Sequence, residues 1–265
     1  MRLAIISDIH ANVDALRAVL ADIRASDVQH VVCLGDLVGY HTFPLETLGV
    51  LRDSEIPSVH GNHDLMAIDR LPRDDCGPVA RKAIRWTQAV LREDDRRYLA
   101  SLPNELRPHR RILCVHSAPG DPVVRLHTPG QFYGQYLRIA EGDPDVHVCF
   151  TGHSHVARTM MVTPRGEVVR APETEVTLAP DAFYFINPGS VGCPRDGDYR
   201  AAYGILDREA QRLSFRRVDY DPTRVLRENA RRRIRVEFGP FVRRSLRSRA
   251  LAAVKGIARL IVGLP

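Results

Sequence analysis

Polar side chains that can bind metal ions follow several short apolar runs of this sequence. Residues 59–64 read V-H-G-N-H-D and place Asn, His and Asp directly after a glycine. Burial of such groups is costly unless hydrogen bonds, a metal ion or a substrate satisfy them. Collected along the chain, the residues of this kind are Asp8, His10, Asp36, Asn62, His63, Asp64, His116, His153 and His155. Their common position after apolar runs predicts one shared site.

Seven of these residues provide enough oxygen and imidazole ligands for two metal ions. Asp36 is predicted to bridge the ions, and the remaining ligands divide into two sets. The first set is Asp8, His10 and His155, and the second set is Asn62, His116 and His153. Two divalent ions bring a charge of about +4, and two carboxylates return −2. Because Asn62 donates a neutral oxygen, the site keeps a positive charge that attracts phosphate.

The elements that must position these ligands are short buried strands. The run LAIIS ends before Asp8, and VHVCFT ends before Gly152 and His153. Apolar residues at helical spacing lie between the first strands, for example over residues 13–23. Strands that alternate with helices form layered α/β folds, in which ligands gather at the carboxyl ends of the strands. Segments 159–171 and 201–220 predict hairpins, so the second half should be more antiparallel.

The order of the motifs D-x-H, G-D, G-N-H-D, H and G-H-x-H resembles that of the calcineurin-like metallophosphoesterase superfamily. Residues 187–198 are similar to its bacterial branch of small phosphodiesterase-like members, and the likeness runs from Met1 to about residue 220. The resemblance implies an α/β fold, a two-sheet β-sandwich flanked by helices. It also implies a dinuclear centre with the seven ligands named above. His41 lies in a loop that departs from the family pattern.

The residues and the resemblance together predict a dinuclear-metal-dependent phosphoester hydrolase that uses a metal-bridging hydroxide. His63 is predicted to act as an acid or transition-state stabiliser, and Asp64 to fix the tautomer of its ring. Arg195 is predicted to contact the phosphate. Manganese is the expected metal, and iron, zinc and nickel accept the same ligands. The other histidines are interpreted as surface or satisfied core residues.

The substrate is left open by the sequence. A phosphodiester is favoured by the bacterial resemblance, but a phosphoprotein, a dinucleoside polyphosphate or a phosphomonoester would meet the same metals. The walls that discriminate between them are expected in loops 39–46 and 117–134. A non-catalytic metal-binding scaffold of the same fold is the alternative from a different class of protein.

Composition is that of an ordinary soluble protein, with 44% hydrophobic and 26% charged residues in 265, and we expect a cytoplasmic location. The sequence contains no apolar run long enough to span a bilayer, and the first residues lack the layout of a secretory signal. Its five cysteines include no C-x-x-C spacing. This pattern argues against both a disulfide framework and a zinc knuckle.

Positive charge is concentrated at the C-terminal end. Residues 222–265 contain twelve Lys or Arg and two Glu, a charge of +10, which leaves −4 of the total of +6 to residues 1–221. We therefore expect a metallophosphoesterase domain over 1–221 and a basic amphipathic helical extension over 222–265. This extension is expected to dock on the domain or on a second subunit of a homo-oligomer, or to bind an anionic membrane surface. Nucleic acid is disfavoured because aromatic residues are scarce there.

Overall fold

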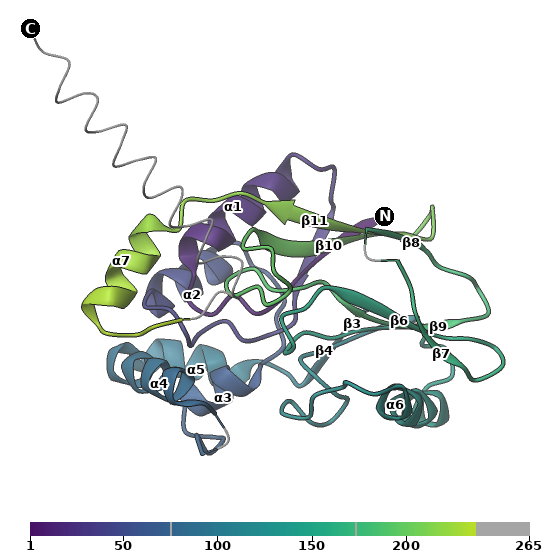
Figure 1. Cartoon of the computed structure of the whole chain (residues 1–265), viewed down its shortest axis with the longest axis horizontal. Coiled ribbons are helices and arrows are strands. Elements are labelled where there is room, and N and C mark those ends of the chain that lie inside the picture. The colour runs from purple at the N-terminus through teal and green to yellow at the C-terminus, as the bar shows by residue number, and fades with distance from the viewer. Residues whose placement is uncertain (75, 173, 237–265) are drawn as a thin grey trace, which may run out of the picture.

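The computed structural model describes residues 1–74, 76–172 and 174–236. This part of the chain contains eleven strands and seven helices. The strands form two sheets that pack face to face, and helices cover the outer surfaces (Figure 1). The predicted two-sheet sandwich flanked by helices is therefore confirmed.

The first sheet has five strands in the order β2-β1-β10-β11-β8. Their bounds are β1 Arg2–Ile6, β2 His30–Cys33, β8 Glu175–Thr177, β10 Ala201–Asp207 and β11 Arg212–Val218. Strands β1 and β2 are parallel, whereas every other pair in this sheet is antiparallel. The β10–β11 pair is the hairpin predicted over residues 201–220.

The second sheet has six strands in the order β3-β4-β5-β9-β6-β7. Their bounds are β3 Glu105–His109, β4 Ile112–Val115, β5 Val148–Phe150, β6 Arg158–Val162, β7 Val168–Arg170 and β9 Phe183–Asn187. Strands β4, β5 and β9 are parallel, and β6 and β7 form the antiparallel hairpin predicted over residues 159–171. The parallel strands β1, β2, β4 and β5 precede the predicted ligands.

The helices are α1 Val13–Arg24, α2 Pro44–Asp53, α3 Asn62–Ala67, α4 Pro78–Val90, α5 Glu93–Ser101, α6 Pro129–Gly142 and α7 Thr223–Arg231. Helix α1 begins where the Asn12 side chain accepts a hydrogen bond from the Ala15 amide at 3.2 Å. Its buried residues recur at helical spacing and pack against the first sheet. Helix α6 buries Phe132 and Ile139 against the second sheet.

The core between the sheets consists of side chains from both inner faces. Ile5 and Leu206 come from the first sheet, and Cys114, Phe150 and Ile186 come from the second. Such burial removes apolar surface from water and fixes the two sheets relative to each other. The ends of β1 and β4 therefore have defined positions on the two sides of the sandwich.

The apolar run before Gly61 does not extend into a full strand. It forms a single parallel bridge between Ser58 and Cys33, because the chain turns into α3 directly afterwards. The amphipathic helix expected from residue 246 onward lies outside the described residues. Helix α7, at the start of the expected extension, buries Val225 completely. The domain division at residue 221 stays a prediction.

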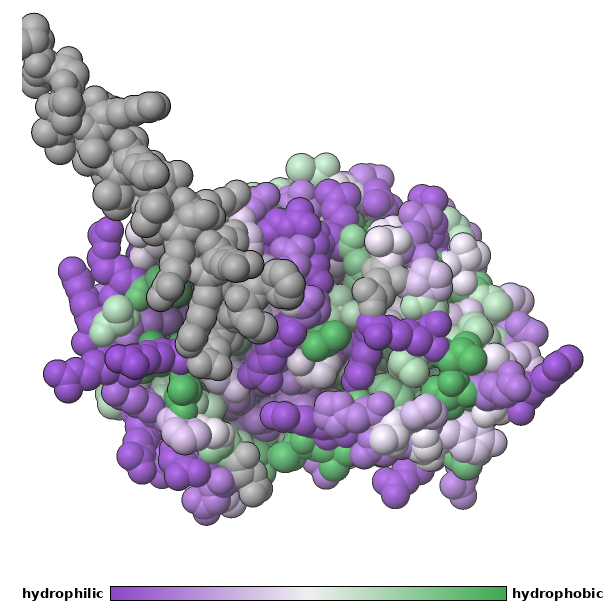
Figure 2. Space-filling view, in the orientation of Figure 1, coloured by the Kyte–Doolittle hydropathy of each residue, from purple (hydrophilic) through white to green (hydrophobic). Residues whose placement is uncertain are grey.

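Figure 2 shows hydrophilic side chains over most of one face, with apolar side chains in small patches between them. Helices that are long and apolar enough to cross a membrane do not occur in the described ranges.

Candidate metal centre

The seven predicted ligands meet at one end of the sandwich. Asp8 and Asp36 follow β1 and β2 of the first sheet, and His116 and His153 follow β4 and β5 of the second. The carboxyl ends of these parallel strands lie at the same end of the molecule, as expected for ligand sites in α/β folds. Asn62 comes from the first turn of α3, which begins one residue after Gly61. Residues far apart in the sequence are thus brought into two adjoining groups.

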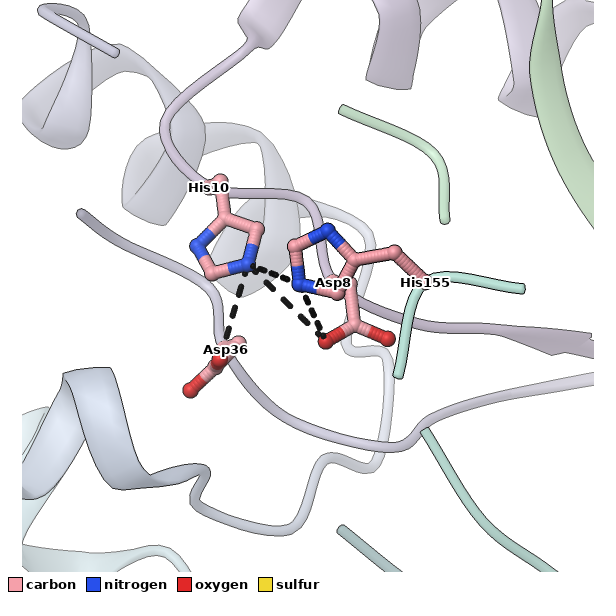
Figure 3. A group of neighbouring side chains, drawn as sticks. All are labelled: Asp8, His10, Asp36 and His155. Atoms are coloured by element: carbon pink, nitrogen blue, oxygen red, sulfur yellow. Dashed lines mark hydrogen bonds and ion pairs between the residues drawn. The ribbon is translucent and has the colours of Figure 1, made fainter. Parts of the chain in front are cut away.

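The first group, named subsite 1 here, consists of Asp8, His10, Asp36 and His155, whose donor atoms all lie within 4.8 Å of one another. Figure 3 shows the two imidazoles and two carboxylates pointing toward a common centre. His10 Nε2 lies 2.9 Å from His155 Nε2 and 3.5 Å from Asp36 Oδ2. Asp8 Oδ1 lies 3.4 Å from His155 Nε2. All four side chains are buried.

The second group, subsite 2, consists of Asp36, Asn62, His116 and His153. Asn62 Oδ1 lies 3.1 Å from His116 Nε2 and 2.9 Å from His153 Nδ1. His116 Nε2 lies 3.4 Å from Asp36 Oδ2, the same oxygen that faces His10 in subsite 1. One carboxylate oxygen therefore belongs to both groups.

The donor atoms have the spacing that a metal ion requires. Ligand atoms about 2.1 Å from one tetrahedral ion lie roughly 3.4 Å from each other. Six distances within the two groups lie between 2.9 and 3.5 Å and agree with that spacing, and a seventh, between Asp8 Oδ1 and His10 Nε2, is 3.9 Å. Two imidazole nitrogens 2.9 Å apart also need either a shared proton or a shared cation between them. The residues present thus fit two divalent ions.

Three of the imidazoles are oriented by backbone carbonyl groups. His10 Nδ1 lies 3.1 Å from the Val38 carbonyl oxygen. His116 Nδ1 lies 2.8 Å from that of Leu34, and His155 Nδ1 lies 2.6 Å from that of Cys193. A carbonyl oxygen accepts, so Nδ1 carries the proton and Nε2 offers a lone pair to the centre. Metal-binding histidines commonly have their other ring nitrogen held in this way.

The backbone is strained at the same positions. Five of the seven candidate ligands have positive φ angles: Asp8 (53°), His10 (51°), Asp36 (53°), His153 (65°) and His155 (59°). Non-glycine residues adopt this left-handed conformation rarely, and such strain clusters at functional sites. The strain turns each side chain inward immediately after its strand ends.

Glycine is required beside the shared carboxylate. A Cβ atom built on Gly61 would overlap the Asp36 carboxylate and its backbone nitrogen. The close approach lets the His63 amide donate a hydrogen bond to Asp36 Oδ1 at 2.8 Å. That bond holds Oδ1, so Oδ2 of Asp36 is directed toward the two subsites.

Burial and neighbouring charges shift the pKa values of the candidate ligands. Burial raises the pKa of Asp8 to about 7. Burial also acts on Asp36, but the imidazoles of His116, His63 and His10 outweigh it and hold the pKa of this carboxyl well below its usual range. The pKa of His116 is raised to about 9, because the Asp36 carboxylate outweighs the opposing effect of burial. The pKa values of His10 and His155 are lowered, mainly by burial.

His63 lies beside the ligands in a cavity of about 230 Å³. Its ring centroid is 4.8 Å from that of His10 and 4.7 Å from that of Tyr40. Among the described residues its Nδ1 atom has no hydrogen-bond partner, and it faces the backbone of Gly39. The structure therefore places His63 at the wall of this cavity, next to the ligand groups.

The predicted contact between Asp64 and the His63 ring is wrong. Asp64 Oδ1 accepts a hydrogen bond from the Val38 amide at 3.1 Å, and Oδ2 accepts one from the Gly61 amide at 2.9 Å. Adjacent residues of a helix do not face each other, so Asp64 points to the backbone beneath α3. It supports the two loops that carry the ligands.

Three further residues line the cavity near the ligands. Arg195 donates a hydrogen bond to the Tyr40 hydroxyl at 2.7 Å, while Arg125 Nε lies 3.4 Å from His153 Nε2. Arg195 is one of the predicted site residues. Tyr40 and Arg125 are not predicted individually, but they lie in loops 39–46 and 117–134, the expected walls of the site.

His41 has a structural position. It is completely buried, with Nε2 3.0 Å from the Gly192 oxygen and Nδ1 2.8 Å from Asn229 Nδ2 of α7. The ring therefore connects its loop to two other segments and does not line the cavity.

Comparisons with known proteins agree with this architecture. Residues 1–211 match the calcineurin-like phosphoesterase superfamily domain. An uncharacterized protein of Methanocaldococcus jannaschii is 33% identical over 222 residues, which cover 83% of this chain and 88% of that protein.

Solved structures with the same fold include two from thermophilic organisms. The crystal structure of a metallophosphoesterase from Sphaerobacter thermophilus has 36% identity and a TM-score of 0.69, covering 89% of this chain and 95% of that one. A hypothetical protein from Pyrococcus horikoshii shares the fold at 18% identity and a TM-score of 0.69, covering 88% of this chain and 94% of that one. The chain belongs to the calcineurin-like phosphoesterase superfamily.

Proposed function

We propose that this protein hydrolyses phosphoesters with two divalent metal ions and that phosphodiesters are its preferred substrates. The observation that carries the proposal is the position of Asp36 Oδ2, which lies 3.5 Å from His10 Nε2 and 3.4 Å from His116 Nε2. A single carboxylate oxygen between two ligand sets is the arrangement that a pair of bridged ions needs. Membership of a phosphoesterase superfamily supports the same reaction class.

The ions would be held by the two subsites already described. Asp8, His10 and His155 would complete subsite 1, and Asn62, His116 and His153 would complete subsite 2. When bound, two divalent ions stabilise charge on the phosphoryl group and lower the pKa of a water molecule toward neutrality. Mixed Asp, Asn and His ligands suit manganese, and iron, zinc and nickel are the alternatives.

The chain's own residues make the site attractive to a phosphate. Asp8 and Asp36 are the two carboxylates among the seven ligands, so two divalent ions would leave a net charge of about +2. Arg125 and Arg195 add cations at the cavity wall. Arginine is suited to forked hydrogen bonds with phosphate oxygens. We expect these two side chains to orient the substrate.

His63 is proposed to donate a hydrogen bond or proton to the leaving oxygen. Its backbone amide is held by Asp36, and its ring lies against Tyr40. These contacts fix the ring at the cavity wall without using it as a ligand. A positioned imidazole of this kind typically contributes on the order of 10²- to 10⁴-fold to a rate.

The preference for diesters rests on the lining of the cavity. Met66 and Val123 give part of its wall an apolar character. A phosphodiester has one negative charge and two organic substituents, which such a wall can contact. A monoester presents one substituent and a greater charge.

A direct experiment compares two chromogenic substrates. Protein stripped of metal is loaded with Mn²⁺ and assayed on bis(p-nitrophenyl) phosphate and on p-nitrophenyl phosphate. We expect Mn²⁺ to restore hydrolysis, with the larger kcat/KM for the diester. A larger value for the monoester would overturn the proposed preference, and the absence of turnover on a wider panel of metals and phosphoesters would favour the scaffold alternative.

A matched pair of variants tests the role of His63. His63→Ala should lose about 10²-fold or more in kcat while it retains both metal ions. His30→Ala removes an exposed histidine at the start of β2 and should behave as wild type. Wild-type activity in His63→Ala would remove His63 from the reaction.

A further inference from the structure

A second cavity lies at the opposite end of the sandwich from the metal centre. It has a volume of about 270 Å³. Its lining residues include Arg111 directly before β4, His147 directly before β5 and Ala182 directly before β9. Strands β4 and β5 therefore begin at this cavity, whereas the candidate ligands follow their other ends. The two sites are separate, and no predicted ligand lines the second cavity.

The floor of this cavity is the end of the core between the sheets. Ile112, Ala182 and Leu206 are buried and line it, and Tyr184 adds an aromatic side chain. These residues also belong to the apolar cluster that joins the sheets. An occupant with a small apolar body would pack against the apolar end of this cluster.

The rim of the cavity is cationic. Arg110, Arg111 and Arg208 line it together with His109 and His147. In the part of the chain that the structure describes, no carboxylate lies within ion-pair distance of any of these three arginines. Other arginines close by do have such partners, because Arg107 pairs with Glu105 and Arg212 with Glu175. Positive charge is thus gathered at the cavity without an internal counter-charge.

Hydrogen-bond donors also converge there without enough acceptors. The Arg111 amide lies 3.2 Å from His109 Nδ1, and Arg208 Nη2 lies 2.6 Å from His109 Nε2. A neutral imidazole has only one acceptor nitrogen, so in either tautomer one of these donors faces an N–H group. Partial burial and then the charges of Arg208, Arg110 and Arg111 lower the pKa of His109. An anion at the rim would accept from the donor that lacks a partner.

We propose that this cavity binds a compact organic phosphate, with the anionic head at Arg111 and Arg208 and a small apolar body on the Ile112, Ala182 and Leu206 floor. The volume lies just below the range of typical small-molecule pockets, which suits a ligand with one ring or short chain. Apolar walls with a few convergent polar groups are the usual character of such pockets.

Phenylphosphonate is a suitable probe because it has a phosphonate head, a single apolar ring and a P–C bond that a phosphoesterase does not hydrolyse. Binding to the full-length Mn²⁺-loaded protein is measured by isothermal titration calorimetry. Asp36→Asn removes the shared metal ligand and isolates the second cavity, which should still bind one equivalent. Arg111→Gln/Arg208→Gln in the same background should weaken that binding about a hundredfold, because two charge-assisted contacts are lost.

Control variants distinguish a built site from general attraction to positive charge. Arg212→Gln removes a neighbouring arginine that is paired with Glu175 and should leave the affinity unchanged. Inorganic phosphate lacks the apolar ring and should bind about tenfold more weakly than phenylphosphonate. The Arg111→Gln/Arg208→Gln variant is also made with Asp36 intact. Hydrolysis of the diester by that protein verifies that the double variant folds. Equal binding by the double variant and its parent, or absence of binding in the Asp36→Asn protein, would overturn the proposal.

Discussion

The two metal subsites share Asp36 but differ in charge and exposure. Subsite 1 contains two carboxylates, and its residues have exposed fractions of 0 to 2%. Subsite 2 replaces the second carboxylate with the Asn62 amide, and Asn62 and His153 have exposed fractions of 6 and 7%. Subsite 1 is therefore the stronger candidate for tight metal binding, whereas subsite 2 is slightly more exposed.

Their surroundings strengthen this contrast. In subsite 1 the unused nitrogens of His10 and His155 face the carbonyl oxygens of Val38 and Cys193, although His155 also lines the cavity. In subsite 2 the unused nitrogen of His153 faces Arg125 at the cavity wall. We therefore expect subsite 1 to hold an ion more tightly and subsite 2 to lie closer to a bound anion.

Removal of the shared ligand should have the largest effect. Asp36→Asn takes away the only charge common to both subsites, so we expect both ions to be lost. Metal-ion stabilisation of a transition state is worth several kcal/mol, which corresponds to a rate loss on the order of 10³-fold. Metal content by mass spectrometry and diester hydrolysis measure the two effects. Retention of one ion per chain would show that the subsites are independent.

Asp94→Asn is the matched control for that experiment. Asp94 is an exposed residue of α5 that pairs with Arg97. Loss of the same charge there should change neither the metal content nor the rate. A comparable loss in this control would mean that net charge, rather than the bridge, explains the result.

A change at Gly61 should disturb both subsites through the backbone. A methyl group in Gly61→Ala would overlap the Asp36 carboxylate, which must then move away from His10 and His116. Loss of an interaction that orients a metal ligand typically costs about 10- to 100-fold in metal affinity or activity. Gly77→Ala is the control, because its added methyl group would meet no heavy atom within 4 Å. Equal metal affinity in the two variants would contradict the role assigned to Gly61.

Asn62→Asp should reduce the difference between the subsites. Wild-type protein is expected to bind Mn²⁺ in two steps, with subsite 1 filled first, because carboxylates favour hard divalent ions. A carboxylate at position 62 should bring the two affinities together. It should also raise KM for the diester about tenfold, because one unit of positive charge is neutralised near the substrate phosphate. An unchanged KM would place the substrate away from subsite 2.

The positions of the ligands could be predicted because they depend on local features. Short apolar runs identify the strands, and a polar residue directly after a parallel strand lies at its carboxyl end. Asp8 and His153 are both read in this way. The same reasoning predicts the two hairpins, since turn residues separate alternating strands. Local sequence was thus sufficient to predict the ligand positions and the hairpins, because neighbouring residues determine the direction of the chain there.

Side-chain contacts between distant loops could not be predicted from the sequence. Tyr40 and Arg125 come from loops whose path depends on packing against distant segments, so their contacts with Arg195 and His153 could not be read from spacing. Asp64 was assigned to the His63 ring because the two are adjacent in sequence. Helical geometry instead directs Asp64 to the Val38 and Gly61 amides. Adjacency in sequence is thus a poor guide to contact within a helix.

The smallest expected effect concerns the support behind subsite 1. Gly192 accepts a hydrogen bond from His41 through its carbonyl oxygen, and its amide donates to the Asp8 carbonyl at 3.0 Å. Asn229 of α7, which is buried, donates to the other ring nitrogen of His41 at 2.8 Å. Asn229→Ala should lower the free energy of unfolding by about 1 kcal/mol and Tm by about 2–4 °C. Thermal and urea unfolding measure these changes.

The Asn229→Ala variant should also affect metal binding, and differently in the two subsites. His41 contacts subsite 1 through Gly192, whose amide donates to the Asp8 carbonyl, and through its own amide, which donates to the His10 carbonyl at 3.1 Å. Asn229→Ala should therefore weaken the first Mn²⁺ binding step slightly and leave the second unchanged. Arg231→Ala alters an exposed residue of the same helix and should leave stability and both steps as in wild type. A weakened second step with an unchanged first would contradict the assignment of His41 and α7 to subsite 1. Full stability in Asn229→Ala would show that its hydrogen bond to His41 contributes little to the domain.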